Sequence, residues 1–125
     1  MNPLSIYLNF IKEKGQPLLE INPGSDEIAL TVNDALEALD LLNACNIAVL
    51  GGDILTKDVN DNLTYAIHSW GYDYHYLNWY CDKIYNESQE DFIKRSYILA
   101  RESIKTANET AKRLDRKCYI CLVLK

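Results

Sequence analysis

The chain contains little glycine and proline, no long apolar run and few basic residues before its last quarter. Only five Gly and three Pro occur in 125 residues that are 48% hydrophobic and 25% charged, which is typical of a globular protein and excludes extensive disorder. No stretch approaches the roughly 18 apolar residues of a membrane span, and residues 1–15 lack the pattern of a signal peptide. We therefore expect one cytoplasmic domain, residues 1–125, that binds no membrane.

Positive charge is scarce over most of the chain. Residues 1–91 hold four Lys or Arg against fifteen Asp or Glu, a balance of −11, whereas residues 92–125 have a balance of +6. This distribution argues against nucleic-acid binding by the acidic part, because phosphate binding needs concentrated positive charge. A basic protein partner fits better, since opposite fields speed encounter and help to select the partner. Solubility alone is the simpler interpretation.

The cysteines show no metal or disulfide pattern. Cys118 and Cys121 lie three positions apart in an expected strand, so their thiols should point to opposite faces and cannot easily share a metal ion or a disulfide. Cys81 precedes Asp82, whose charge would raise the thiol pKa and weaken its nucleophilicity. We predict four reduced thiols, no metal and no cofactor.

The Gly51-Gly52-Asp53 sequence follows an apolar run, as phosphate-binding loops do. It lacks the lysine of a Walker loop and the third glycine of a dinucleotide fingerprint. We predict a structural turn in which Asp53 bonds the local backbone.

Three helices carry clear start signals. Asn2 and Pro3 supply an N-cap and a first-turn proline for a helix over 3–14. Capping-box-like pairs, three residues apart, precede helices over 32–44 and 88–114. The last helix has an apolar stripe at alternating spacings of four and three: Ile93, Tyr97, Ala100, Ile104, Ala107, Ala111 and Leu114.

Shorter apolar runs predict the strands. Residues 47–50, continued by Ile54 and Leu55, should form a hairpin with residues 63–69 around a turn at 58–62. Leu18–Ile21 is a short extended candidate, and the apolar run 118–124 predicts a central strand. The fold class is α+β: a small, largely antiparallel sheet of about three to five strands packed by about three helices, the longest near 88–114.

The segment from Trp70 to Asp82 is the most unusual part of the chain. Six of its thirteen residues are Trp or Tyr. Buried Tyr and Trp need hydrogen-bond partners, whereas at interfaces they supply large contact area with few rotors. If the segment is extended, Trp70, Tyr72, Tyr74 and Tyr76 share one face. A strand that covers its own core remains an equal alternative.

We therefore predict a partner-binding surface and no catalytic residues. Its aromatic candidates, with the histidine between them, are Trp70, Tyr72, Tyr74, His75, Tyr76 and Tyr80. Its acidic candidates, which would meet basic groups of the partner, are Asp53, Asp58, Asp61, Asp73 and Asp82.

Several of these segments together resemble a known family. They are residues 35–39 leading into 46–53, the Trp79-Tyr80-Cys81-Asp82 sequence, the capped helix from Ser88 and the closing apolar strand. Over residues 28–125 the chain resembles bacterial immunity proteins of polymorphic toxin systems, including contact-dependent growth inhibition, and is most similar to the immunity protein 40 family. The resemblance implies a non-enzymatic protein made beside its toxin that binds the toxin's C-terminal domain and blocks it.

Three functions follow as hypotheses. The first is an inhibitor of a cytosol-acting toxin domain, a nuclease, with the chain a monomer or weak dimer before it binds. The second is a small enzyme that uses His75 and Cys81. The third is a regulatory binding subunit unrelated to toxins.

Overall fold

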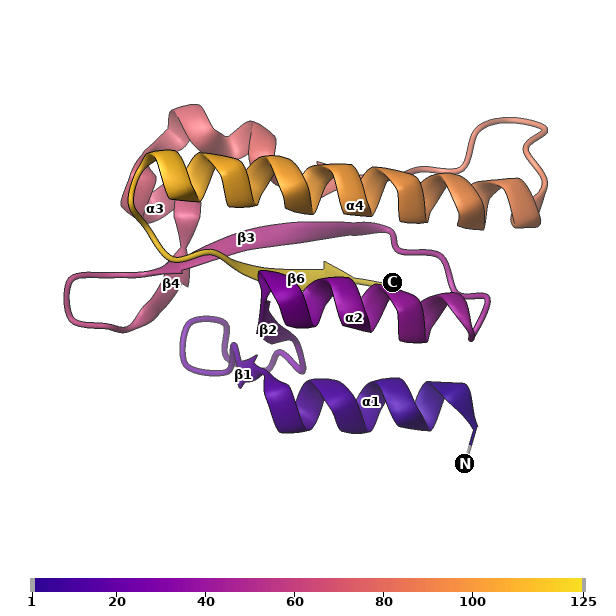
Figure 1. Cartoon of the computed structure of the whole chain (residues 1–125), viewed down its shortest axis with the longest axis horizontal. Coiled ribbons are helices and arrows are strands. Elements are labelled where there is room, and N and C mark those ends of the chain that lie inside the picture. The colour runs from indigo at the N-terminus through magenta and orange to yellow at the C-terminus, as the bar shows by residue number, and fades with distance from the viewer. Residues whose placement is uncertain (1, 125) are drawn as a thin grey trace.

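The computed structural model describes residues 2–124, in which an open antiparallel sheet is packed by helices (Figure 1). The helical elements are α1 (Pro3–Lys14), α2 (Val32–Asn43), α3 (Ala66–Trp70), the 3-10 helix η1 (Tyr72–Leu77) and α4 (Gln89–Arg113). The strands are β1 (Gln16–Pro17), β2 (Ile28–Thr31), β3 (Gly51–Lys57), β4 (Leu63–Tyr65), β5 (Trp79–Tyr80) and β6 (Tyr119–Val123). The predicted α+β class is confirmed.

The sheet has the order β1-β2-β6-β3-β4, and β5 also pairs with β3. All pairs are antiparallel, and the register aligns Ile120 of β6 with Leu30 on one side and Ile54 on the other. The predicted central position of the last strand is confirmed, as expected for a strand with few polar residues.

The three predicted helix starts are also confirmed. The side chain of Asn2 accepts a hydrogen bond from the Ser5 amide at 2.8 Å. Thr31 Oγ1 accepts from the Asp34 amide at 3.2 Å, which satisfies a donor that the first turn of α2 leaves unpaired. Ser88 does the same for α4, accepting from the Asp91 amide at 3.1 Å.

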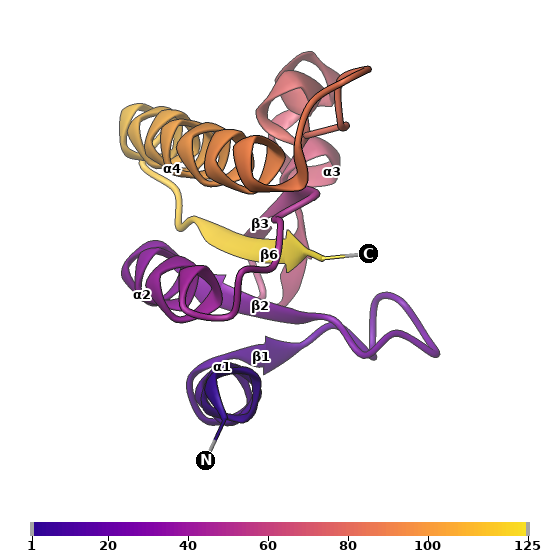
Figure 2. The same cartoon turned by 90° about the vertical axis from the view of Figure 1, so that its right-hand side faces the viewer.

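The main core lies between the sheet and the pair of helices α2 and α4, which cover the same side of it (Figure 2). Ile104 from the apolar stripe of α4 and Leu39 from α2 are fully buried there with Ile54 and Ile120 of the sheet. A smaller cluster of Leu18, Ala29, Leu55 and Cys121 occupies the other side. The stripe was predicted correctly, and it is what fixes α4 to the sheet.

Several local predictions were wrong. Strand β3 begins at Gly51, so residues 47–50 precede the strand and the Gly51-Gly52-Asp53 sequence is regular strand, not a turn. Residues 18–21 form a turn, and the expected strand 63–69 stops at Tyr65, where α3 begins. Strand β2 was not predicted at all. Short strands such as these form because they pair with strands that are distant in the sequence. A window of about four residues does not contain this information.

Trp79 packs where β3 has no side chains. A Cβ atom added at Gly52 would overlap the Trp79 indole, and one added at Gly51 would overlap the Trp79 carbonyl oxygen. Trp79 pairs with Gly52 across the ladder and is 6% exposed. Gly52 is therefore needed for close approach of the indole and Gly51 for close approach of the Trp79 backbone, a recurrent role of glycine in strands.

We expect Gly52→Ala to lower the free energy of unfolding by about 1–3 kcal/mol through overpacking, measured by urea denaturation. In a Trp79→Leu background the same substitution should cost clearly less, because the space that the indole fills is then free. Equal costs in the two backgrounds would show that Trp79 is not the reason for the glycine.

Candidate partner-binding surface

The aromatic segment is an excursion from the edge of the sheet. Strand β4 pairs with residues 55–57 of β3, and β5 pairs with Gly51 and Gly52 at the other end of the same edge. Between β4 and β5 the chain leaves the sheet as α3 and η1. Residues 66–78 therefore join two halves of one interrupted edge.

Buried contacts fix both ends of the excursion. Ala66 and Leu77 are 1% and 3% exposed and belong to the main core. Between the two short strands, the Asn78 side chain accepts a hydrogen bond from the Ile54 amide at 2.8 Å. This side-chain oxygen takes the place of a strand carbonyl, so the Ile54 donor is satisfied although no residue of β4 or β5 pairs with Ile54 on this edge.

The outward side of η1 is lined by exposed rings. Tyr72 and Tyr76 are 73% and 58% exposed. Tyr72 stacks on His75, with ring centroids 4.6 Å apart and planes inclined by 14°, and the Tyr72 carbonyl accepts a hydrogen bond from His75 Nδ1 at 2.9 Å. We refer to Tyr72, Asp73, His75 and Tyr76 as the η1 surface.

The shared face predicted for an extended segment is wrong. A 3-10 helix has three residues per turn, so Tyr72 lies beside His75 instead of Tyr74. Trp70 and Tyr74 are half-buried against the main core and meet edge to face, with centroids 6.0 Å apart. Within residues 2–124 the Trp70 indole nitrogen has no hydrogen-bond partner. These two rings attach the segment that carries the η1 surface to the core.

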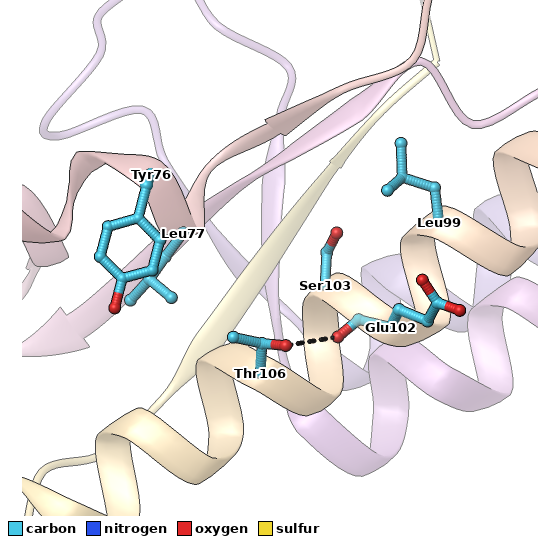
Figure 3. Close-up of a pocket in the computed structure, with 6 residues that line it drawn as sticks. All are labelled: Tyr76, Leu77, Leu99, Glu102, Ser103 and Thr106. Carbon is cyan, nitrogen blue, oxygen red and sulfur yellow. Dashed lines mark hydrogen bonds between the residues drawn. The ribbon is translucent and has the colours of Figure 1, made fainter.

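A pocket separates η1 from α4 (Figure 3). Tyr76 and Leu77 stand on one side of it, and the α4 residues Leu99, Glu102, Ser103 and Thr106 stand on the other. The Thr106 hydroxyl donates to the Glu102 carbonyl at 3.0 Å, so it is already satisfied within the helix. The pocket gives the η1 surface a concave border with a mixed polar and apolar lining.

Arg95 holds the loop that connects β5 to α4. Its Nε and Nη2 each donate to Glu87 at 2.8 Å, Nη2 also donates to the Asp82 carbonyl, and Nη1 donates to the Cys81 thiol at 3.5 Å. The bond to Arg95 is the main reason that the pKa of Glu87 is lowered to about 2, and an amide donor at Ile84 adds to it. One guanidinium thus orders residues 81–87, including the exposed Tyr85.

The acidic candidates fall into three places. Asp58 and Asp61 shape the β3–β4 turn: Asp58 accepts from the Asn60 and Asn62 amides at 2.9 and 3.0 Å, and Asp61, with a φ of 62°, pairs with Lys117 at 3.6 Å. Asp73 and Asp82 are exposed. Asp53 lies apart from both groups, on the side of the sheet opposite α2 and α4.

Strand pairing brings Asp53 together with three tyrosines. Tyr80 pairs with Gly51, two residues before Asp53, so its side chain points to the same side of the sheet. Tyr65 and Tyr119 both pair with Leu55, two residues after Asp53, and therefore share that side as well. We call Asp53, Tyr65, Tyr80 and Tyr119 the open sheet face. Tyr65 and Tyr119 were missed from the sequence, because only the register of β3 reveals their place.

A family model described as immunity protein 40 matches residues 17–124. The chain belongs to the immunity protein 40 family. Comparisons with curated proteins and with solved structures gave no match. Family membership makes the general function of this immunity protein the neutralisation of a toxin, and the partner of such a protein is a toxin protein. Helix α1 lies outside the matched residues.

The cysteines of the immunity protein offer no activated nucleophile among the described residues. All four are free, and burial raises the pKa of Cys81 despite the nearby Arg95. Burial also raises the pKa of Cys118 to about 12. Cys118 packs on the helix side of the sheet and Cys121 on the other, as their spacing predicts. His75 is exposed and bonded within η1, so the Cys81–His75 enzyme hypothesis gains no support from the geometry.

In residues 2–124, no three His, Cys, Asp or Glu side chains are grouped so that they could ligate a metal ion. None of the described helices combines the length and the apolar character that crossing a bilayer requires.

We expect Arg95→Met to release the β5–α4 loop, because Arg95 is the one cation among residues 2–124 that bonds Glu87. The pKa of Glu87, followed by NMR, should return from about 2 toward its ordinary value of about 4.3. Amides of residues 82–88 should exchange faster while those of β6 stay protected.

The matched control is Lys94→Met, which removes a neighbouring exposed charge that pairs with Glu90 at 3.4 Å. It should leave the pKa of Glu87 unchanged. The sign of the effect is fixed: a lowered carboxyl pKa stabilises the loop above pH of about 4.3, and this contribution is lost as the pH falls toward 2. An unchanged pKa of Glu87 in Arg95→Met would contradict the conclusion that Arg95 lowers it.

Proposed function

We propose that the chain neutralises its toxin by binding the toxin's C-terminal domain through the η1 surface and the rings beside it. It acts in this proposal as a stoichiometric, non-enzymatic inhibitor in the cytoplasm, without cofactor or nucleic acid. It is a monomer or weak dimer before the toxin binds.

The observation that carries the proposal is the exposure of two tyrosines of η1. Tyr72 and Tyr76 are 73% and 58% exposed, so neither ring fills the core. Tyrosine is enriched at interface hot spots, because it buries much area and loses few rotors on binding. Trp70 and Tyr74 pack this segment against the main core, so less order has to be acquired on binding.

The charge of the chain supports a nuclease as the toxin. A nuclease domain carries basic groups where it holds phosphates. Residues 1–91, which include the whole aromatic segment, have a balance of −11. Opposite fields would speed association with such a domain and would favour it over other proteins.

Co-expression tests the proposal directly. We expect the C-terminal domain of the toxin to arrest growth when expressed alone, and co-expression of this chain should restore growth. The two proteins should co-purify at a fixed ratio. Loss of nuclease activity without a stable complex would favour an enzymatic mechanism over inhibition by binding.

The double variant Tyr72→Ala/Tyr76→Ala should weaken toxin binding on the order of 100-fold, measured by calorimetry, as expected when hot-spot rings are removed. Stability should change little, because both rings are exposed. Tyr74 is left in place because it packs against the core.

Ile6→Ala is the matched control, since Ile6 is 42% exposed on α1, at the opposite end of the molecule from η1 (Figure 1). It should bind toxin as the unmodified chain does. Unchanged affinity in the double tyrosine variant would move the interface away from η1.

A further inference from the structure

The side of the sheet opposite α2 and α4 is not covered by a helix at β6 (Figure 2). The connection from β1 to β2 covers part of it through Leu18, which packs on Leu55 and Cys121. Asp53, Tyr65 and Tyr119 nevertheless stay half-buried, and Tyr80 is 79% exposed. The open sheet face therefore presents three rings and a carboxylate to a partner.

Asp53 has no partner within the described chain. Its carboxylate makes no hydrogen bond and no ion pair with residues 2–124. Burial raises its pKa, and the charge of nearby Glu27 raises it further. Both effects disfavour the ionised form, so the fold around Asp53 opposes a negative charge at this place.

The other polar groups near Asp53 do not relieve this charge. Glu27 is held by the loop, accepting from the Ser25 hydroxyl at 3.2 Å and from the Cys121 thiol at 3.5 Å. Lys57 lies four residues along β3 on the same side, but its Nζ donates to Gln16 at 2.9 Å and lies 5.6 Å from the Tyr119 ring centre. Lys57 thus interacts with Gln16 and Tyr119 and does not pair with Asp53.

We propose that the open sheet face is a second docking site for the toxin, where an arginine or lysine side chain of the toxin inserts among Tyr65, Tyr80 and Tyr119 and pairs with Asp53. The inference rests on the proposed function and adds the chemistry of the contact. It differs from the η1 surface in its residues and in its kind of interaction.

Charge and ring geometry favour a basic side chain over other occupants. A cation between Asp53 and Glu27 would be attracted by two carboxylates. Both are half-buried, so this attraction is weakly screened by salt and solvent. Aromatic faces also attract cations, as Lys57 already shows at Tyr119. An acidic or purely apolar segment would leave the Asp53 carboxylate unpaired, which is costly. A second copy that met this face with its own open sheet face would bring like charge to the same place.

Asp53→Asn is the decisive variant, because it keeps the size of the side chain and removes the charge. We expect a melting temperature equal to or higher than that of the unmodified chain, since the fold disfavours the ionised carboxylate. We expect toxin binding to weaken roughly tenfold or more, with a smaller dependence on salt. A structural role would instead lower the melting temperature.

Glu37→Gln is the matched control: Glu37 is exposed on α2, across the sheet from Asp53, and the substitution changes net charge by the same amount. It should bind as the unmodified chain does. Equal losses of toxin affinity in Glu37→Gln and Asp53→Asn would show that only long-range charge matters, and this would overturn the docking site. Unchanged affinity in Asp53→Asn would also overturn it.

These outcomes separate the two proposals. If the unmodified chain rescues growth and Tyr72→Ala/Tyr76→Ala loses binding while Asp53→Asn does not, only the second docking site fails. If the unmodified chain neither binds nor rescues, the proposed function fails and this inference fails with it.

Discussion

The packing of Trp79 on Gly51 and Gly52 is the constraint on which the exposed surfaces depend. It returns the chain to the edge of β3 after an excursion of thirteen residues, 66–78, and the Asn78 side chain bridges the gap in the ladder. Because the excursion cannot pair with β3, its rings are free to face outward. The same interruption leaves only short stretches of unpaired edge, which protects the sheet against pairing with other chains.

The sequence predicted the elements whose causes are local. Asn2 and Ser88 cap their helices through side chains three residues from the amides they satisfy, so the signal lies in one short window. The stripe of α4 repeats over many turns, and β6 is apolar throughout. Such features do not depend on a partner strand, and for this reason the bounds of α1, α2 and α4 came out close to those observed.

The surfaces could be predicted only in part. The aromatic content of residues 70–82 indicated a segment with exposed rings. The assumption of an extended chain, however, put Tyr72 and Tyr74 on one face. In the 3-10 helix, which has three residues per turn, Tyr72 stacks on His75 instead. Acidity alone did not distinguish Asp53 from Asp58, which only shapes a turn. Tyr65 and Tyr119 join Asp53 through the register with Leu55, and register is a property of three strands together.

In our proposal, the two surfaces contribute to inhibition in different ways. Exposed rings on a supported segment bury area without much ordering, and this slows dissociation. An unpaired carboxylate adds little to affinity by area, but it attracts a basic partner from a distance and penalises any partner that lacks a cation at that place. An immunity protein must capture its toxin before damage accumulates and must ignore other proteins. We propose that the half-buried, unpaired Asp53 meets the second requirement in a way that more tyrosines could not, because it selects for a cation on the partner.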